Sequence, residues 1–251
     1  MVQLSALYRK RFAETGLDRR QAVWRTLCDA YFSKLIPKDA AVLDVACGYG
    51  EFINNVEARE KYAVDLNPDA GGRLDPEVRF THTAATDLSS LPASSVDVAF
   101  TSNFLEHLRS KEEIDTVFQQ VRRVLRPNGR FILMGPNIKY AYKHYWDFYD
   151  HHLPLSHLSL GEGLSAAGYR LEKVIPQFLP FTMNNGAPTA DFLIRAYLAF
   201  PPAWKIMGAQ FLVVASKDNS IAQPAAAEES SRSMGGIPPM VGATGFEPAT
   251  P

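Results

Sequence analysis

Residues 41–52 read AVLDVACGYGEF, an apolar run that ends in Asp44 and is followed by a turn of small residues. This order predicts a buried strand, a tight turn and then a helix, with a ligand crevice at the carboxyl end of the strand. Gly48 and Gly50 lack a Cβ atom, so the backbone can bend sharply there and a ligand can approach it closely. The stretch therefore predicts the first strand and the binding loop of an open α/β sheet.

Further strand signals follow at regular intervals. Strands are expected at 61–65, 78–81, 96–102 and 130–134, and a helix is expected at 111–125. Asp65 lies 21 positions after Asp44, where an acid is well placed to hydrogen-bond both hydroxyls of a ribose. Strands that alternate with helices predict a parallel, doubly wound sheet of the α/β class.

The ordered series VLDVACGYGEF, YAVDLNP, ATDLSSLP, VDVAFTSNFLEHL and VRRVLRPNGRFILMGPN resembles the class I S-adenosylmethionine-dependent methyltransferases of the small-molecule type. The resemblance covers roughly residues 38–217. It implies a Rossmann-like methyltransferase fold, in which a doubly wound and mostly parallel sheet of seven strands has its last strand reversed. It also implies S-adenosyl-L-methionine as the cofactor.

The motifs that carry the resemblance also imply which residues contact that cofactor. Asp44, Gly48 and Gly50 would contact its methionine part. Ala46 belongs to the same loop and stands where many members of the family have glycine. Asp65 would hold the ribose.

The remaining implied contacts follow the second, third and fourth strands. Leu66 would pack on the adenine ring, and Asp87 would accept a hydrogen bond from the adenine amino group with Leu88 beside it. Ser102 and Asn103 would line the site after the fourth strand.

A nicotinamide dinucleotide is the rival ligand for the same loop. The dinucleotide pattern G-x-G-x-x-G would start at Gly48 and would need glycine at position 53, where this chain has Ile53. A branched side chain there obstructs the close packing of helix on strand near a pyrophosphate. Asp44 and Glu51 would also repel a phosphate, whereas a sulfonium cofactor without phosphate suits both acids.

Composition limits the partners and the compartment. The formal net charge is −1 at pH 7, so no strong field attracts nucleic acid or an anionic membrane. No apolar run reaches the ~18 residues of a membrane span. The two cysteines, Cys28 and Cys47, show neither metal-ligand spacing nor a disulfide framework. This usage suits a reducing compartment, and we expect a cytoplasmic protein.

The catalytic group is sought among the histidines, because a hydroxyl acceptor has to lose a proton and histidine is the natural base near neutral pH. His152 and His157 lie in the connection after the fifth strand, which borders the acceptor pocket in this fold. His107 follows the fourth strand within a Glu-His pair that is often structural in relatives. No metal site is expected, since no carboxylate at ligand spacing accompanies His151, His152 and His157.

One methyltransferase domain is expected over residues 1–217, with a helical cover at 1–36 and an insertion at 176–202 before the last strand. Residues 218–251 are rich in Ala, Pro, Ser, Gly and Glu and are expected to be disordered. Aromatic residues crowd the connection at 136–154, which is either an adaptable wall of the ligand pocket or a satellite core.

The expected function is methyl transfer from S-adenosylmethionine to a small-molecule acceptor, at oxygen. Two alternatives stay open: a catalytically silent scaffold that binds the cofactor, and a protein methyltransferase. Nucleic acid is disfavoured as acceptor because the Asn-Pro-Pro-Tyr type of loop is absent after the fourth strand, where the chain reads SNFL at 102–105.

Overall fold

The computed structural model describes residues 17–181 and 190–220. The chain divides into two compact units, Met1–Ile221 and Ala222–Pro251, and the second unit lies wholly outside the described residues. The first part of the expected helical cover, residues 1–16, and residues 221–251 of the expected disordered tail also lie outside them.

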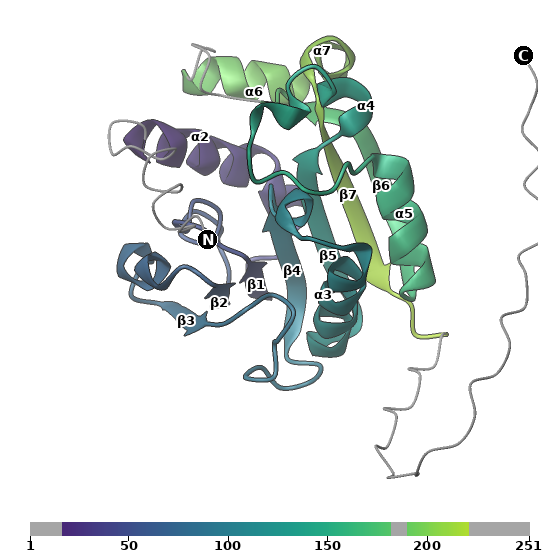
Figure 1. Ribbon diagram of the computed structural model, residues 1–251. Helices are drawn as coiled ribbons and strands as arrows, with labels where there is room; N and C mark the ends of the chain where they lie inside the picture. The colour runs from purple at the N-terminus through teal and green to yellow at the C-terminus, as the bar shows by residue number, and fades with distance from the viewer. Residues whose placement is uncertain (1–16, 182–189, 221–251) are drawn as a thin grey trace, which may run out of the picture. The chain divides into compact units, whose positions relative to one another are not determined.

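A seven-stranded sheet forms the centre of the first unit, in the strand order β3-β2-β1-β4-β5-β7-β6 (Figure 1). All neighbouring strands from β3 to β5 pair in parallel, whereas β7 is antiparallel to both of its neighbours, β5 and β6. The expected α/β fold with a reversed last strand is therefore confirmed. The strands are β1 (Ala41–Val45), β2 (Glu60–Asp65), β3 (Val78–His82), β4 (Val96–Ser102), β5 (Leu125–Pro136), β6 (Tyr169–Leu179) and β7 (Gln210–Lys217).

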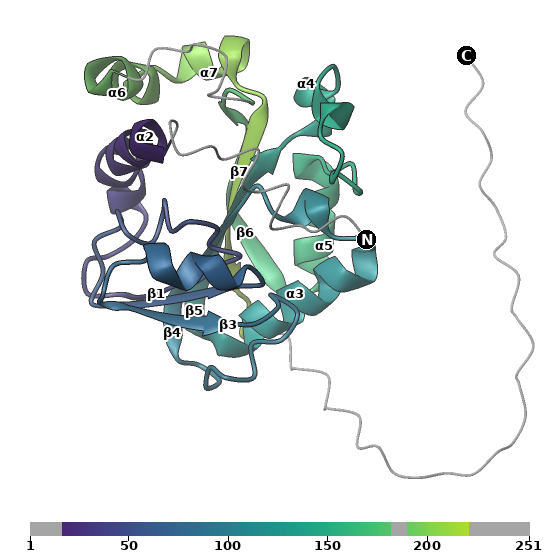
Figure 2. The ribbon, with the colours of Figure 1, turned by 60° about the vertical axis from the view of Figure 1, so that its left-hand side comes forward.

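Helices cover both faces of this sheet. The described α-helices are α2 (Leu17–Ala30), α3 (Lys111–Val124), α4 (Ile138–Ala141), α5 (His157–Ala166), α6 (Asp191–Ala199) and α7 (Pro201–Met207). Short 3-10 helices are η2 (Phe32–Lys34), η3 (Pro68–Arg73), η4 (Leu105–His107) and η5 (Tyr145–Asp147). Figure 2 shows α3 and α5 on one side of the sheet and α2 and α6 on the other.

The strands divide their side chains between two apolar cores. On β5, Phe131 and Leu133 join the core under α3 and α5, whereas Ile132 and Met134 join the core under α2. Successive side chains of a strand point to opposite faces, which explains this alternation. Asp44 is two positions from Val42, a member of the α2-side core, so its carboxyl lies on the α2 face of the sheet.

The helix expected directly after the Gly-rich turn is absent, and residues 51–55 form turns instead. Two asparagine side chains bond backbone groups at this point: Asn54 Nδ2 donates to the Arg73 carbonyl at 2.9 Å, and Asn55 Nδ2 donates to the Glu51 carbonyl at 2.8 Å. Side chains that compete for backbone partners in this way favour turns over helix. That local expectation was wrong, although the binding loop itself has the expected place.

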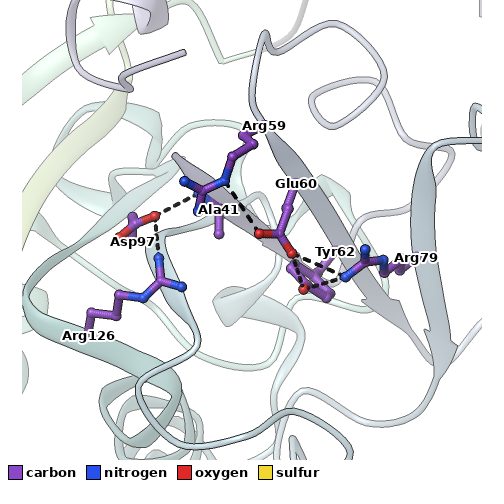
Figure 3. A network of polar contacts seen from close by, with 7 residues as sticks. All are labelled: Ala41, Arg59, Glu60, Tyr62, Arg79, Asp97 and Arg126. Atoms are coloured by element: carbon purple, nitrogen blue, oxygen red, sulfur yellow. Dashed lines mark hydrogen bonds and ion pairs between the residues drawn. The ribbon is translucent and has the colours of Figure 1, made fainter. Parts of the chain in front are cut away.

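A polar network ties the strands together at their amino-terminal ends, away from the binding loop (Figure 3). Asp97 accepts hydrogen bonds from the Ala41 backbone at 2.8 Å and from the Arg126 guanidinium at 2.6 Å. Glu60 pairs with Arg79 at 3.2 Å. Partial burial opposes the charged form of Asp97, but the Arg126 and Ala41 hydrogen bonds outweigh it and hold the pKa below its usual range. The network therefore fixes the register of β1, β4 and β5.

Candidate active site

A cavity of about 260 Å³ opens at the carboxyl ends of β1 and β4. Its floor is the loop after β1, and its sides are α2, the segment after β4 and the connection between β5 and α5. The lining residues are Arg20, Trp24, Leu27, Asp44, Ala46, Cys47, Gly48, Tyr49, Glu51, Phe52, Ser102, Asn103, Glu106, His107, Met134, Phe148, His151, Leu179, Phe181 and Gln210.

The loop after β1 is held in an unusual backbone conformation. Ala46, Gly48 and Gly50 have φ angles of 59°, 57° and 78°. At Gly50 a Cβ atom would lie 2.4 Å from Leu74 Cδ2, so glycine is required there, whereas at Gly48 the nearest atom would be 3.8 Å away. Ala46 holds a left-handed conformation that costs roughly 1–2 kcal/mol outside glycine. Strain of this kind concentrates at binding sites. The absence of a side chain at Gly48 also leaves space beside the backbone there.

Asp44 is the buried acid of the cavity. Burial raises the pKa of its carboxyl well above the usual range, and the nearby carboxylates of Glu51 and Asp65 raise it further. A buried carboxylate is stabilised by a cationic or hydrogen-bonding partner. Asp44 therefore offers the cavity a partner for a cationic or hydrogen-bonding group of a ligand.

Asp65 joins the loop after β1 to the loop after β2. Its Oδ2 accepts from the Gly48 backbone N–H at 2.8 Å, and its Oδ1 accepts from the Asn67 backbone N–H at 2.7 Å. A carboxylate oxygen has more than one acceptor site, so each retains capacity for a ribose hydroxyl. Leu66, the next residue, is 63% exposed and presents an apolar surface at the same edge of the sheet.

The other expected cofactor residues fall into two groups. Ala46, Ser102 and Asn103 line the cavity together with Asp44 and Gly48. The remainder lie outside its lining: Gly50, Asp65, Leu66, Asp87 and Leu88. Of these last residues, Leu88 is fully buried.

The three expected catalytic histidines are separated by the fold. His107 lines the cavity. His152 has an exposed side chain, and its backbone N–H donates to the Glu106 carbonyl at 2.8 Å. His157 begins α5, where its Nδ1 accepts from Asn137 Nδ2 at 2.9 Å. Burial, and then the charge of Lys139, lowers the pKa of His157.

The aromatic connection after β5 is both core and pocket wall. Tyr145 is fully buried, and its hydroxyl donates to the Leu153 carbonyl at 2.6 Å. Phe148 and His151 line the cavity, with their rings stacked at a centroid distance of 4.9 Å. Neither residue was singled out as a site residue in the sequence, although the density of aromatic residues in this segment marked it.

Glu106 and Gln210 are two further lining residues that sequence reasoning did not select. Glu106 precedes His107 and is buried. Gln210 begins β7, is only 5% exposed, and its Oε1 atom has no hydrogen-bond partner among the described residues. No local signal marks Gln210, because it reaches the cavity only through the reversed pairing of β7 with β5.

Aromatic rings and an ion pair close the α2 side. Trp24 packs edge-on against Phe52 and Phe100, at centroid distances of 6.3 and 6.0 Å. Arg20 of α2 forms an ion pair with Glu51 of the binding loop. The cavity is therefore walled by rings on two sides, which excludes water from a bound ligand. The candidate residues at 1–16 of the expected helical cover lie outside the described residues.

Comparisons with known proteins agree with the class of protein that the fold indicates. Residues 43–133 match the family described as "Methyltransferase domain". The fold and this match support a class I S-adenosylmethionine-dependent methyltransferase, a class whose cofactor is S-adenosyl-L-methionine.

Among individual proteins, the chain is 28% identical over 102 residues to a probable S-adenosylmethionine-dependent methyltransferase, CRG1, of Saccharomyces cerevisiae. That match covers 36% of this chain, and the chain spans only about a third (34%) of the yeast protein.

Solved structures share the fold at low sequence identity. A methyltransferase from Archaeoglobus fulgidus has a TM-score of 0.56 at 21% identity, over 77% of this chain and 94% of its own. A putative methyltransferase in complex with the Trm112 activator of Haloferax volcanii has a TM-score of 0.61 at 17% identity, over 85% and 97%. These likenesses support the fold class.

Proposed function

We propose that the protein transfers the methyl group of S-adenosylmethionine to a small-molecule acceptor, at oxygen. The observation that carries this proposal is one cavity lined by two chemically different sets of residues. One set is the buried Asp44 with the Gly48 loop, and the other is a group of aromatic rings together with Glu106, His107 and His151. The first set suits the cofactor, and the second suits an acceptor that has to be held and deprotonated.

Cofactor binding is assigned to the edge formed by the ends of β1, β2 and β3. Asp44 and the loop residues Ala46, Gly48 and Gly50 would hold the methionine part, and Asp65 would hold the ribose. The exposed Leu66 would cover the adenine. Asp87 and Leu88 would border the adenine, with Ser102 and Asn103 completing the wall after β4.

When bound, the cofactor supplies a methyl group on a sulfonium, which is already a good leaving group. The protein therefore has to align the acceptor and exclude water, and orientation alone can supply roughly 7–11 kcal/mol of the barrier. Trp24, Phe148 and Phe181 give the cavity walls that do this. Their rings favour an apolar or ring-bearing acceptor.

The acceptor is expected to carry a hydrogen-bond donor. Gln210 Nε2 donates to the Pro180 carbonyl at 2.7 Å, so the amide orientation is fixed and Oε1 is the atom left to accept. A buried acceptor atom without a partner is costly, and a ligand hydroxyl or amine would satisfy it. We assign the activation of the acceptor hydroxyl to the polar group of the cavity, which includes His107; His152 and His157 would need rearrangement of their segment to take part.

Several further parts of the proposal rest on general properties of the chain. No helix in the described parts of the chain is long and apolar enough to cross a membrane. Cys28 and Cys47 are free and buried, which suits a reducing compartment such as the cytoplasm. Nucleic acid is not proposed as acceptor, since the charge is near balance.

Transfer of a labelled methyl group tests the function. The purified protein is incubated with methyl-labelled S-adenosylmethionine and, separately, with a panel of hydroxylated aromatic molecules, an amine panel and a protein extract. Label in the hydroxylated products supports the proposal, and label in protein or amine products contradicts the acceptor class. Binding of S-adenosylhomocysteine without transfer to any panel supports the silent scaffold instead.

A further inference from the structure

Glu106, His107 and His151 form a cluster with the composition of a metal site. Each offers one ligand atom, and these atoms lie within 4.8 Å of one another. Glu106 and His151 are buried, His107 is partly buried, and all three line the cavity. We propose that this cluster binds a borderline divalent metal ion such as Zn²⁺ or Co²⁺ beside the acceptor. Binding of the ion does not depend on the proposed function; only the role of the ion in the reaction rests on it.

The sequence does not reveal this cluster, because its members come from two distant segments of the chain. Glu106 and His107 end η4 after β4, and His151 lies in the connection before α5. Backbone hydrogen bonds join the two segments: the N–H groups of His152 and Leu153 both donate to the Glu106 carbonyl, at 2.8 and 3.1 Å. The backbones that carry the three side chains are thus fixed relative to one another.

The surroundings of His107 orient its ring for metal binding. Nδ1 lies 2.9 Å from the Asp150 carbonyl oxygen and 3.3 Å from its carboxylate. Both neighbours are acceptors, so Nδ1 carries the proton and the neutral ring presents the Nε2 lone pair. A carbonyl or carboxylate partner on the far nitrogen is the usual support of a metal-bound histidine.

The lone pair of Nε2 faces another acceptor. His107 Nε2 lies 3.9 Å from Glu106 Oε1, so an ion placed between these two atoms would have both within reach as ligands. The His107 and His151 rings lie at a centroid distance of 4.9 Å, so the second imidazole borders the same position.

His151 is held by the aromatic connection. Its ring stacks on Phe148 and meets Tyr145 edge-on, both at centroid distances of 4.9 Å. Ligand atoms around a tetrahedral ion with bonds of about 2.1 Å stand ~3.4 Å apart. The ligand atoms, which lie within 4.8 Å of one another, would have to move closer when the ion binds.

Two imidazoles and one carboxylate select a borderline ion rather than Mg²⁺, which prefers oxygen ligands. Three protein ligands leave a coordination position open for the acceptor hydroxyl, whose pKa the ion would lower. The hydroxyl proton then leaves to water, the oxygen forms its bond to the methyl carbon, and the electron pair of the carbon–sulfur bond returns to sulfur. The acceptor oxygen therefore carries no net charge after the transfer.

Metal titration tests the site without any acceptor. Protein stripped with EDTA and dialysed is titrated with Co²⁺ followed by its visible absorption, and with Zn²⁺ by calorimetry. We expect one ion per chain with a dissociation constant below about 10 µM, and Zn²⁺ displacing Co²⁺. Glu106→Gln and His151→Asn should each weaken binding at least tenfold. Asp150→Asn, which supports His107, should weaken it roughly 10–100-fold.

The control is His144→Gln, since the His144 side chain is 70% exposed and lies outside the cluster. It should bind Co²⁺ as the wild type does. Absence of stoichiometric binding to the wild type, or equal binding by the wild type and His151→Asn, overturns the metal site. Calorimetry with S-adenosylhomocysteine separates this outcome from the proposed function: cofactor binding without metal binding rejects the inference alone.

Discussion

The Asp44 carboxyl is fully buried, and its raised pKa has a consequence for stability. A carboxyl whose pKa is higher in the folded state stabilises the fold below its unfolded pKa of about 3.9, and this contribution is lost as the pH rises through the raised pKa. The buried Asp44 therefore makes the unliganded protein less stable as the pH rises above that unfolded value. Asp44→Asn should raise the melting temperature by about 2–4 °C or more, since each kcal/mol is worth that much in a domain of this size.

The same substitution should reduce S-adenosylhomocysteine affinity more than tenfold, because the cofactor ammonium would lose its carboxylate. Thermal melts between pH 5 and 8 and calorimetry measure the two effects, and the stability gain should grow with pH. Asp69→Asn is the control, because Asp69 is exposed. A lower melting temperature for Asp44→Asn across this range would contradict the assignment.

Asp65 is predicted to act on both the cofactor and the loop. Asp65→Ala removes the acceptor for the Gly48 and Asn67 backbone groups and for the ribose. S-adenosylhomocysteine binding should weaken by about 1.5–3 kcal/mol, as expected for hydrogen bonds to a charged group. Unchanged affinity in calorimetry would remove Asp65 from the site.

At the scale of residues, the sequence predicts those site groups that lie in one short motif. Asp44, Ala46 and Gly48 are close neighbours in the chain, at the end of β1 and in the loop after it, and all three line the cavity. Glu106, His151 and Gln210 come from three separate segments, and only the folded sheet brings them together. A single sequence does not show which distant residues lie close together in the fold, so it does not reveal the proposed metal-ligand set.

At the scale of elements, the connection between η5 and α5 depends on one buried hydroxyl. Tyr145 Oη donates to the Leu153 carbonyl at 2.6 Å and accepts from the Leu155 N–H at 3.2 Å. Tyr145→Phe leaves both groups without this partner, at a cost of about 1–3 kcal/mol. Because His151 lies in this connection, turnover and metal affinity should fall while S-adenosylhomocysteine affinity stays. Tyr149→Phe, at a residue 80% exposed, should change none of them.

The network at the opposite edge of the sheet should affect stability alone. Asp97→Ala breaks the contacts to Ala41 and Arg126. Because the pKa of Asp97 is lowered in the folded state, the stability that Asp97 contributes is present above its unfolded pKa of about 3.9. This stability is lost as the pH falls through the folded pKa. The melting temperature should fall by a few degrees at neutral pH, and the difference from the wild type should shrink in acid. A change in S-adenosylhomocysteine affinity would contradict the separation of the two edges.

Elements were predictable where the sequence pattern is strong and local. β4 begins and ends where the pattern placed it, and α3 ends one residue before the expected position. The turns at 51–55 were not predictable from periodicity, because this segment also has contacts with distant residues, such as the Asn54 Nδ2 hydrogen bond to the Arg73 carbonyl. β6 runs past Pro176 to Leu179, into the expected insertion at 176–202, and Leu179 pairs with Gln210 of β7 after an irregularity in the register.

At the scale of the whole molecule, cofactor choice should appear in thermal stability. A ligand that binds only the folded state at 100 times its dissociation constant adds about 2.7 kcal/mol, or roughly 5–10 °C for a domain of this size. S-adenosylhomocysteine should give such a shift. NADH should give none, because Ile53 occupies the position where a dinucleotide loop needs glycine and is fully buried in the α2-side core.

The expected difference between S-adenosylhomocysteine and NADH follows from the charges and the space around the loop after β1. Asp44 and Glu51 lie beside the Gly48 backbone, so a pyrophosphate there would meet two carboxylates, whereas a sulfonium and an ammonium would meet partners. Replacing Ile53 by Gly would remove the steric obstacle but not the acids, so Ile53→Gly should lose stability and still ignore NADH. Stabilisation by NADH in either protein, measured in the same thermal-melt series, would mean that the loop binds phosphate after all.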